Sequence, residues 1–540
     1  MGCENDRAEI DGVSAPPRRR RISEDDRVRR FTRGAEAWRA STSTIQPPAI
    51  GWPMNARGIR TNFMFNVAGA LAPLIIALVT VPIYVSHIGA ARYGALSIVW
   101  VLLGYFGFLD LGMSRASANA LAKHEEARER SSILVTAFAI NLALGVAGGL
   151  VLYIGGRVFL QYLLDVPPEL EGELDSVFPW LACVVPMTLL TGVASGALES
   201  RERFLTINAL QIAGSIVGQV LPVLCAVLVS PSLSVVVPAA VLARFPLFLL
   251  MLAFVIRREG PLSLTSFDRP RAGALLNYGG WISVTNFLAP LIVSLDQLVI
   301  GSALGLAAVT YYVVPLNVVL RTQIFAAALS RTLFPRMSRL QGDDARRLTE
   351  SAIGTLAHGY AVACSVAIVL IGPFMNLWMG PDFAVVAAPI AEILMIGAWI
   401  NGIAFLPFAH LQGQGRPDII SKYLALELFP FLLVLWLATR HFGIEGSAYA
   451  WVARAPVHLL FLLAMMRFEK TRYAQLVLPF GCVMTAFVLV RLVRPGLFES
   501  LLIASAFAVS TSAIAFAIDQ NIKSLFARLK GEAIALKDAA

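Results

Sequence analysis

Six ionisable side chains lie inside long apolar runs of the sequence, where a charge is expensive. Placing Arg, Asp or Glu at the centre of a membrane helix costs about 2.5–3.5 kcal/mol on insertion scales, so such residues persist where they pair or face a wet cavity. A guanidinium stays charged when buried and binds phosphate through two parallel hydrogen bonds. A buried carboxylate can instead take up a proton or a cation. The six residues are Arg244, Asp296, Arg321, Glu392, Glu427 and Arg454.

Two interpretations of these residues compete. In the first, the three arginines line a cavity and bind an anionic substrate, while the three acids bind a coupling ion. In the second, all six are buried ion pairs that lock helices together. We favour the first interpretation for Arg321 and Asp296, which lie on adjacent expected helices and could also pair with each other. For the other four residues we favour the second interpretation.

Two further charges, Asp110 and Arg115, bracket the inner end of the second expected helix. We interpret them as capping or interface groups rather than as ligands for a substrate.

The sequence contains no pattern typical of an enzyme. We find no GxSxG, HExxH or Walker A motif, and no loop is long enough for a catalytic domain. The five cysteines show no ligand spacing, so we expect neither a metal site nor a cofactor. A chain without these features is not expected to catalyse a reaction or to hydrolyse ATP.

The composition indicates that a lipid bilayer, and not water, surrounds much of the surface of this chain. Of 540 residues, 57% are hydrophobic and 15% are charged, whereas a soluble domain has roughly 25% charged residues. The mean hydropathy is +0.70. A water-facing surface of this size could not be covered by so few polar side chains, so the chain is an integral membrane protein.

The apolar runs are long enough to cross the membrane as helices, each needing roughly 20 residues. Because the runs do not alternate between apolar and polar residues, we expect an all-α protein. Fourteen runs lie near 62–86, 93–113, 132–155, 177–198, 206–229, 234–256, 276–301, 306–330, 351–372, 385–411, 418–439, 445–466, 474–491 and 500–518.

The basic residues between these helices predict the orientation. With both ends in the cytoplasm, the inner segments hold 36 Lys and Arg and the outer segments hold 5. Such an asymmetry is the usual signature of cytoplasmic loops. It also accounts for the net charge of +9, so we expect no nucleic-acid partner. The outer loop 156–176 is instead acidic.

A short internal sequence repeat predicts that the chain consists of two related halves. Leu71-Ala72-Pro73-Leu74-Ile75 recurs as Leu288-Ala289-Pro290-Leu291-Ile292. Each copy is followed by a glycine turn, at Gly89 and Gly305, and by a tyrosine in the next helix. Since six helices separate the copies, both cross in the same direction, as in transporters built from two parallel six-helix lobes. We therefore predict two pseudo-symmetric lobes around a central cavity.

The predicted organisation divides the chain into six segments. They are a basic cytoplasmic tail (1–60), an N-lobe (61–256), an inter-lobe linker (257–275), a C-lobe (276–466), helices thirteen and fourteen (467–518), and a cytoplasmic tail (519–540). The first tail lacks the apolar core of a signal peptide. An alternative is that translation begins at Met54.

Several stretches resemble the polysaccharide transporters, the O-antigen and oligosaccharide flippases of the multidrug/oligosaccharidyl-lipid/polysaccharide exporter superfamily. The matching stretches are YFGFLDLGMSRASANALAKH (105–124), LLNYGGWISVTNFLAPLIVSLDQLVIGSALG (275–305), ALSRTLFPRMSRL (328–340), HLQGQGRPDIISKYLALELFPFLLVLW (410–436) and FGIEGSAYAWVAR (442–454).

The resemblance implies a fourteen-helix, two-lobed fold in the bacterial inner membrane. It also implies flipping of a polyprenyl-diphosphate-linked oligosaccharide to the outer leaflet for polysaccharide synthesis. The implied partners are this lipid-linked oligosaccharide, membrane lipids, a polysaccharide polymerase and chain-length components. Two alternatives stay open at this point: a cation-coupled drug antiporter on the same fold, and a membrane glycan polymerase or ligase.

Overall fold

The computed structural model describes residues 75–110, 112–124, 126–164, 166–201, 203–260, 268, 292, 294–519 and 521–524. The regular secondary structure of these residues is helical throughout, which confirms the predicted fold class. The predicted tail 1–60 and most of the predicted linker 257–275 lie outside the described residues.

A first group of helices extends to residue 260 and begins with the apolar helix Ile75–Ile88. The others are α3 (Ala90–Phe106), α4 (Met113–Lys123), α5 (Ala127–Leu163), α6 (Pro168–Glu199), α7 (Phe204–Leu228), α8 (Leu233–Leu242) and α9 (Phe245–Glu259).

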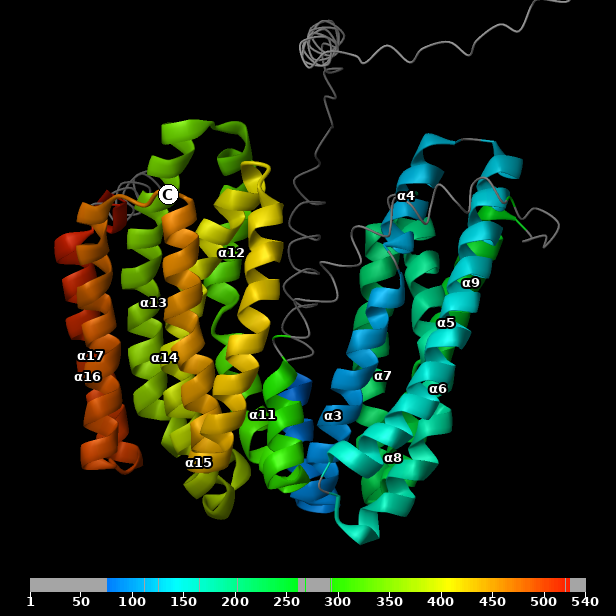
Figure 1. Ribbon diagram of the computed structural model, residues 1–540, viewed down its shortest axis with the longest axis horizontal. Coiled ribbons are helices and arrows are strands. Elements are labelled where there is room, and N and C mark those ends of the chain that lie inside the picture. Colours follow the sequence, from blue (N-terminus) through cyan, green and yellow to red (C-terminus); the bar gives the residue numbers. More distant parts are fainter. Residues whose placement is uncertain are drawn as a thin grey trace, which may run out of the picture. The chain divides into compact units, whose positions relative to one another are not determined.

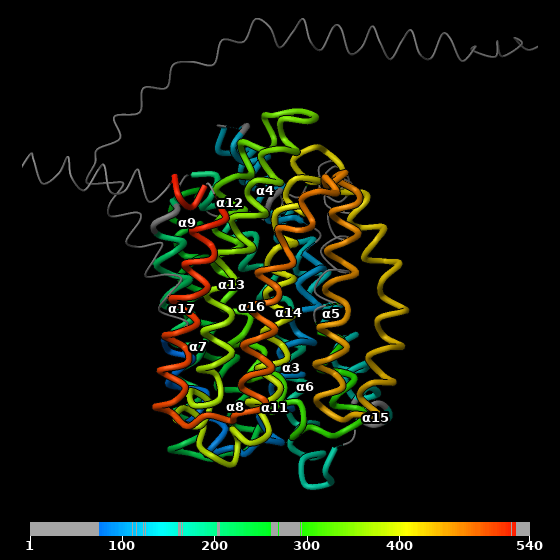
Figure 2. Tube along the Cα trace, turned by 90° about the vertical axis from the view of Figure 1, so that its left-hand side faces the viewer, coloured from blue at the N-terminus to red at the C-terminus, as the bar shows by residue number. Residues whose placement is uncertain are grey.

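A second group of helices follows, beginning with helical residues 294–304. It continues with α11 (Leu306–Arg321), α12 (Ile324–Arg339), α13 (Gly342–Met379), α14 (Pro381–Gly413), α15 (Pro417–Met465), α16 (Ala474–Val493) and α17 (Leu497–Ile518). Both α16 and α17 pack against α13, as Figure 2 shows.

The described helices account for nearly all predicted crossings. Ten are long and apolar enough to span a membrane, or eleven when α11 and α12, bent by 43°, count as one. The predicted number of fourteen is approximate, because the first and seventh runs are only partly described.

The long helix α15 is in fact a hairpin that supplies two of the predicted crossings. Its backbone leaves helical geometry at Gly443, with φ 62°, a value that favours glycine. On either side of this break, Thr439 and Ser447 share a 2.8 Å hydrogen bond. Further along the two arms, Tyr423 stacks on Phe461 with ring centroids 4.0 Å apart. The chain therefore reverses at Gly443.

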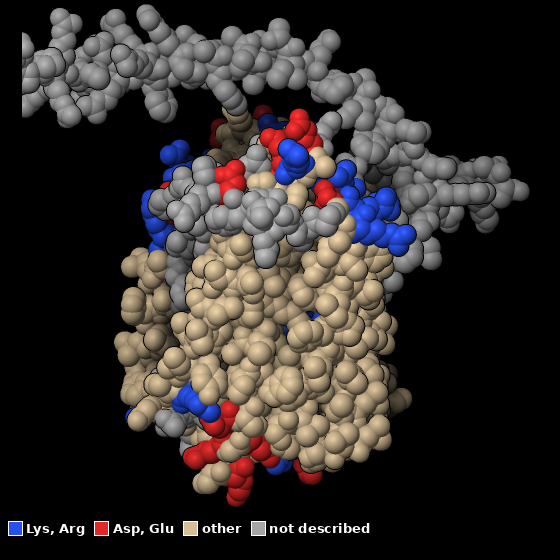
Figure 3. All heavy atoms as spheres, turned by 90° about the vertical axis from the view of Figure 1, so that its right-hand side faces the viewer, with Lys and Arg blue, Asp and Glu red and all other residues tan. Residues whose placement is uncertain are grey.

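Charge is distributed along the molecule as expected for a membrane protein. The face in Figure 3 shows a broad belt with almost no charged side chains, between two ends where charged side chains gather. One end includes Glu169 and Glu171, in the first turn of α6. Large apolar side chains such as Leu150, Ile154 and Leu249 are exposed, which is favourable only where lipid replaces water.

The main contact between the two helix groups joins α3 and α11, which lie together between the groups (Figure 1). Gly94 makes this approach possible, because a Cβ there would lie 1.8 Å from the carbonyl oxygen of Leu306. The hydroxyl of Thr310 donates a 2.5 Å hydrogen bond to the carbonyl of Ala90. Small residues commonly allow such close packing between membrane helices.

The internal repeat is also visible at this contact, where matched positions of the two halves face each other. The glycines that precede α3 and α11 adopt nearly the same backbone geometry, with φ 81° and ψ 161° at Gly89 and φ 82° and ψ 170° at Gly305. If these glycines are matched, residues 90 and 94 correspond to 306 and 310. Each helix therefore presents the same positions to the other, which is the hallmark of two-fold symmetry. The exact limits of the two lobes remain a proposal, since their ends lie outside the described residues.

The two halves of the repeat also have helix breaks at matching positions. After α3, a short 3-10 helix (Gly107–Asp110) precedes α4, and after α11 a bend of 43° precedes α12. The second and eighth predicted crossings are therefore both interrupted at about the same distance from their glycine caps.

We predict that Gly94→Ala destabilises the protein, because the added methyl group must push α3 away from Leu306. Overpacking of this kind costs about 1–3 kcal/mol. Thermal unfolding of the purified protein in detergent measures the change. Gly104→Ala is a matched control in the same helix, since nothing lies within 4 Å of a Cβ at that position. Equal melting of the two variants would contradict the assigned close contact.

Candidate functional site

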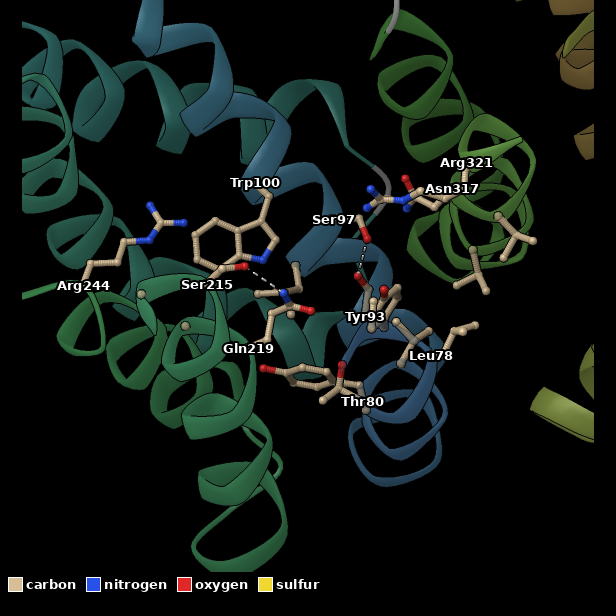
Figure 4. A pocket seen from close by; sticks show the side chains of 18 of the residues that line it. Leu78, Thr80, Tyr93, Ser97, Trp100, Ser215, Gln219, Arg244, Asn317 and Arg321 are labelled. Carbon is tan, nitrogen blue, oxygen red and sulfur yellow. Dashed lines mark hydrogen bonds between the residues drawn. The ribbon is translucent and has the colours of Figure 1, made fainter. Parts of the chain in front are cut away.

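A cavity of about 640 Å³ lies between the two helix groups, beside the contact of α3 with α11. Its walls come from helix 75–88, α3, α6, α7, the start of α9, α11 and Trp378 of α13. The polar and aromatic side chains that line it are Thr80, Tyr84, Tyr93, Ser97, Trp100, Thr188, Thr191, Ser215, Gln219, Arg244, Asn317, Arg321 and Trp378. Figure 4 shows most of these side chains.

The charge of this cavity has a single sign. Among the described residues that line it, the ionisable side chains other than tyrosine are Arg244 and Arg321, and no Asp or Glu contributes. The two arginines approach from opposite helix groups (Figure 4). Walls of low polarity strengthen the field of a charge, so the described lining gives the cavity a positive field.

Arg244 is positioned by a helix break and an aromatic ring. It lies between α8 and α9, at the N-cap of α9, and Pro246 stands in the first turn of that helix. Its guanidinium carbon lies 4.8 Å from the centre of the Trp100 ring, within the range of a cation–π interaction. Within the part of the chain that the structure describes, Arg244 forms no ion pair, so its charge is left for a ligand.

Arg321 is the last residue of α11, immediately before the bend into α12. The next residue, Thr322, is held by a 2.7 Å hydrogen bond to the hydroxyl of Tyr360. The Arg321 side chain is exposed and points into the cavity beside Asn317 (Figure 4). It forms no ion pair with another described residue.

The remaining lining was not predicted from the sequence. Trp100 presents an aromatic face, and the amide of Gln219 donates a 3.2 Å hydrogen bond to Ser215. Asn317 adds a second amide from the opposite helix group. The two amides could have been predicted from the sequence, because Gln219 and Asn317 are polar residues that interrupt long apolar runs. Trp100 could not have been predicted, since an aromatic residue in such a run is usually part of the core.

A second cluster of charges lies apart from the cavity. Arg454 forms a 3.5 Å ion pair with Glu427 across the α15 hairpin, and both side chains are nearly buried, at 12% and 7% exposed. The Tyr423 hydroxyl donates a 3.2 Å hydrogen bond to the same carboxylate, and His458 lies 3.8 Å from it. Arg454 is therefore placed with Glu427, and it is not among the described residues that line the cavity.

Asp296 belongs to this second cluster. It is 1% exposed, and its electrostatic neighbours are Tyr312 and Arg454. The pairing of Asp296 with Arg321, which the sequence allowed as one possibility, is not observed. The two residues face different parts of the molecule. The helix of Asp296 packs against α15 through Leu295 and Val299, whereas Arg321 points into the cavity.

Glu392 occupies a different position from the other two acids. It forms a 3.1 Å ion pair with Arg491 of α16. The same guanidinium donates a 3.1 Å hydrogen bond to the carbonyl of Pro389 and lies 3.9 Å from Glu445. These contacts tie α14 to α16 and α15, a geometry that favours a structural ion pair over a site for a transported ion.

Asp110 caps the start of α4. Its carboxylate accepts hydrogen bonds from the hydroxyl and the backbone N–H of Ser114, at 3.0 and 3.4 Å. The side chain of Arg115 lies outside the described residues. Within the described chain, no group of three or more His, Cys, Asp or Glu residues could hold a metal ion.

We predict that Arg454→Met destabilises the protein, because Glu427 would be left as a buried charge without its partner. Removing one member of a buried pair costs about 3–5 kcal/mol, whereas replacing both by apolar groups is often close to neutral. The double variant Arg454→Met with Glu427→Met should therefore regain part of the lost melting temperature, since Glu427 no longer needs a partner whereas Asp296 still lacks its cation. A double variant as unstable as the single one would refute the pairing.

Sequence comparison places the chain among proteins of polysaccharide synthesis. Residues 88–372 match the family described as "Polysaccharide biosynthesis protein". A protein of Shigella flexneri named "Putative O-antigen transporter" is 26% identical over 405 residues, which cover 74% of this chain and 96% of the relative. The "Uncharacterized membrane protein EpsK" of Bacillus subtilis is 22% identical, with 72% of this chain and 79% of the relative covered.

Comparison of structures identifies the fold. A structure titled "Lipid II flippase MurJ, inward closed conformation" is similar, with a TM-score of 0.67, 12% identity, and coverage of 84% of this chain and 99% of that chain. An inward-facing multidrug resistance transporter of the MATE family has a TM-score of 0.63, 15% identity, and coverage of 76% and 98%. At these identities the likeness shows the fold alone. Together with the match over 88–372, it confirms the resemblance seen in the sequence: the chain is a multi-pass membrane protein that belongs to the polysaccharide biosynthesis protein family, with the fold of the multidrug/oligosaccharidyl-lipid/polysaccharide exporters.

Proposed function

We propose that the protein is a flippase that moves a polyprenyl-diphosphate-linked oligosaccharide from the cytoplasmic to the outer leaflet of the bacterial inner membrane. The main support for the proposal is the cavity between the helix groups, whose described lining contains two arginines and no acid. The "Putative O-antigen transporter" of Shigella flexneri supports the same class of cargo.

A diphosphate fits these two arginines for chemical reasons. It carries negative charge on both phosphoryl groups, and a guanidinium binds phosphate oxygens through paired, charge-assisted hydrogen bonds. Because Arg244 and Arg321 come from opposite helix groups, an anion between them would be held by both groups at once. The cargo would thereby favour a conformation in which the two groups stay close.

The neutral lining suits the sugar part of the cargo. Aromatic rings such as Trp100 offer an apolar face for the C–H groups of a sugar ring, and Tyr and Trp also keep a polar handle. The amides of Gln219 and Asn317 can each donate and accept hydrogen bonds with sugar hydroxyls. The polyprenyl chain needs no pocket in this proposal, since it remains in the bilayer.

The contact of α3 with α11 would close the cavity on the outer side. In the predicted orientation the second helix runs from outside to inside, so Gly94 and Leu306 lie near the outer face. For release to the outer leaflet, this contact would separate while the inner ends of the two groups come together, which is alternating access. Both ends of the chain are cytoplasmic in this scheme.

The cluster of Asp296, Glu427 and Arg454 is our candidate for energy coupling. Protonation of either acid would remove one partner of Arg454 and change the balance of charge between the α15 hairpin and helix 294–304. A buried ionisable group in a transporter is commonly part of a proton or ion relay. Glu392 is left out of the proposal because it lies apart from this cluster, in an ion pair with Arg491 that ties α14 to α16.

The alternatives are less consistent with the cavity. A drug antiporter for cationic compounds needs carboxylates in its cavity, and none of the described lining residues is acidic. A polymerase or ligase needs catalytic groups outside the membrane helices, whereas the functional groups here line a cavity between them. We therefore propose transport rather than catalysis, with a polysaccharide polymerase and chain-length components acting on the exported product.

We predict that Arg321→Ala and Arg244→Ala each lower the transport rate at least about tenfold. A hydrogen bond to a charged group contributes about 1.5–3 kcal/mol, and 1.4 kcal/mol is a factor of ten. Transport is measured in proteoliposomes as the appearance of lipid-linked oligosaccharide in the opposite leaflet.

The matched control for these two variants is Arg331→Ala. Arg331 is exposed on α12, bonds only to the carbonyl of Ala327 within its own helix among its described contacts, and does not line the cavity. Its loss should leave transport within about twofold of the native rate, the range expected of a surface substitution. Native transport rates for both cavity variants would refute the proposed role of the arginines.

We predict that Asp296→Asn removes the stimulation of transport by a proton gradient, because the amide keeps the shape of the side chain but cannot titrate. Transport without a gradient should continue at its basal rate. The measurement compares proteoliposomes with and without an imposed pH difference. Glu392→Gln, which removes the same charge elsewhere, should keep the stimulation; a gradient response that survives Asp296→Asn would rule out this coupling site.

A further inference from the structure

A second pocket, separate from the central cavity, lies where α6 and α9 end. Its volume is about 220 Å³, and it is lined by Ala197, Leu198, Arg201, Arg203, Val255, Arg258 and Glu259. Three of these seven side chains are arginines, and the predicted topology places this end of the helices on the cytoplasmic side. The proposed transport mechanism makes no use of this pocket.

Among the described residues that line the pocket, the one acid, Glu259, already has partners. The carboxylate of Glu259 is 3% exposed and accepts two hydrogen bonds from Arg130, both 2.6 Å long. It accepts two more from Arg201, at 2.9 and 3.2 Å. Two guanidinium groups thus share a single carboxylate, and the network keeps a net positive charge.

The other two arginines add to this charge. Arg203 stands at the N-cap of α7, and Arg258 stands in the last turn of α9. Both are exposed, and neither forms an ion pair with a described residue. They are not needed to cap the ends of α6 and α9, because Ser200 and Gly260 already donate their backbone N–H groups to carbonyls of those helices, each at 3.0 Å.

The pocket is continuous with a lipid-facing surface. Leu250, Phe254 and Arg258 follow one another at intervals of four residues, so they share one face of α9. Leu250 is 50% exposed and Phe254 is 39% exposed. The inner wall of the pocket is itself apolar, with Leu198 and Val255. A ligand on this face would meet positive charge at its head and an apolar stripe along its tail.

We propose that this pocket binds the phosphate headgroup of an anionic phospholipid from the inner leaflet. The phosphate would lie between Arg203 and Arg258, beside the Arg201–Glu259 pair, with an acyl chain along Phe254 and Leu250. Basic pockets between membrane helices on the cytoplasmic side are typical sites for such headgroups. A bound lipid would link the N-terminus of α7 to the ends of α6 and α9.

Calorimetry on the purified full-length protein in a neutral detergent tests the proposal. The probes are dioctanoyl phosphatidylglycerol, dioctanoyl phosphatidylcholine and inorganic phosphate. We expect phosphatidylglycerol to bind at least tenfold more tightly than phosphatidylcholine, and inorganic phosphate to compete only weakly. Equal binding of the two lipids would overturn the proposal, and full competition by inorganic phosphate would show a site for soluble anions instead.

The variant that tests the assignment is Arg203→Gln with Arg258→Gln. Both side chains are exposed, so the fold should be retained, and a melting curve without lipid verifies this. The matched control is Arg336→Gln with Arg339→Gln, which removes two exposed arginines from the last turn of α12, another predicted inner segment. We expect the first variant to weaken phosphatidylglycerol binding at least tenfold and the control to change it less than twofold. Equal affinity in both variants would refute the site.

Discussion

The close contact of α3 with α11 determines how the rest of the structure is arranged. Gly94 lets the two helices meet backbone to backbone at Leu306, and the matching positions of the two repeats face each other there. Because these helices touch at one end and diverge, their inner faces become walls of the cavity that holds Trp100 and Asn317. The symmetry of the fold and the position of its cavity therefore have a common origin.

The distribution of charge follows from the cost of burying it. Away from the cavity, Glu427 is paired with Arg454 and Glu392 with Arg491. In the cavity, Arg244 and Arg321 have no acid beside them among the described residues. A protein keeps such unpaired charges at membrane depth where water or a ligand can solvate them, and this contrast is the physical basis of the proposed anionic cargo.

The sequence predicted the helices and the repeat well, because both depend on local patterns such as apolar runs and the glycines at 89 and 305. It also pointed to Arg244 and Arg321 as candidates, since a charge in an apolar run stands out. It could not predict which way each charge points. Asp296 and Arg321 looked like neighbours, yet one faces the α15 hairpin and the other faces the cavity. Trp100 was missed for the opposite reason, because nothing in an apolar run separates a cavity-lining tryptophan from a core one. The break at Gly443 falls between the predicted crossings 418–439 and 445–466, so both arms of α15 were expected, and only the contacts between them emerged from the structure.

Imaging the complex tests whether the two cavity arginines hold the diphosphate of the cargo. A cryo-electron microscopy map of the protein in nanodiscs, with polyprenyl-diphosphate-linked oligosaccharide added, would locate the phosphates. We predict density for the diphosphate between the guanidinium groups of Arg244 and Arg321, with the sugar beside Trp100. Cargo density outside the cavity, or a diphosphate that contacts neither arginine, would contradict this prediction.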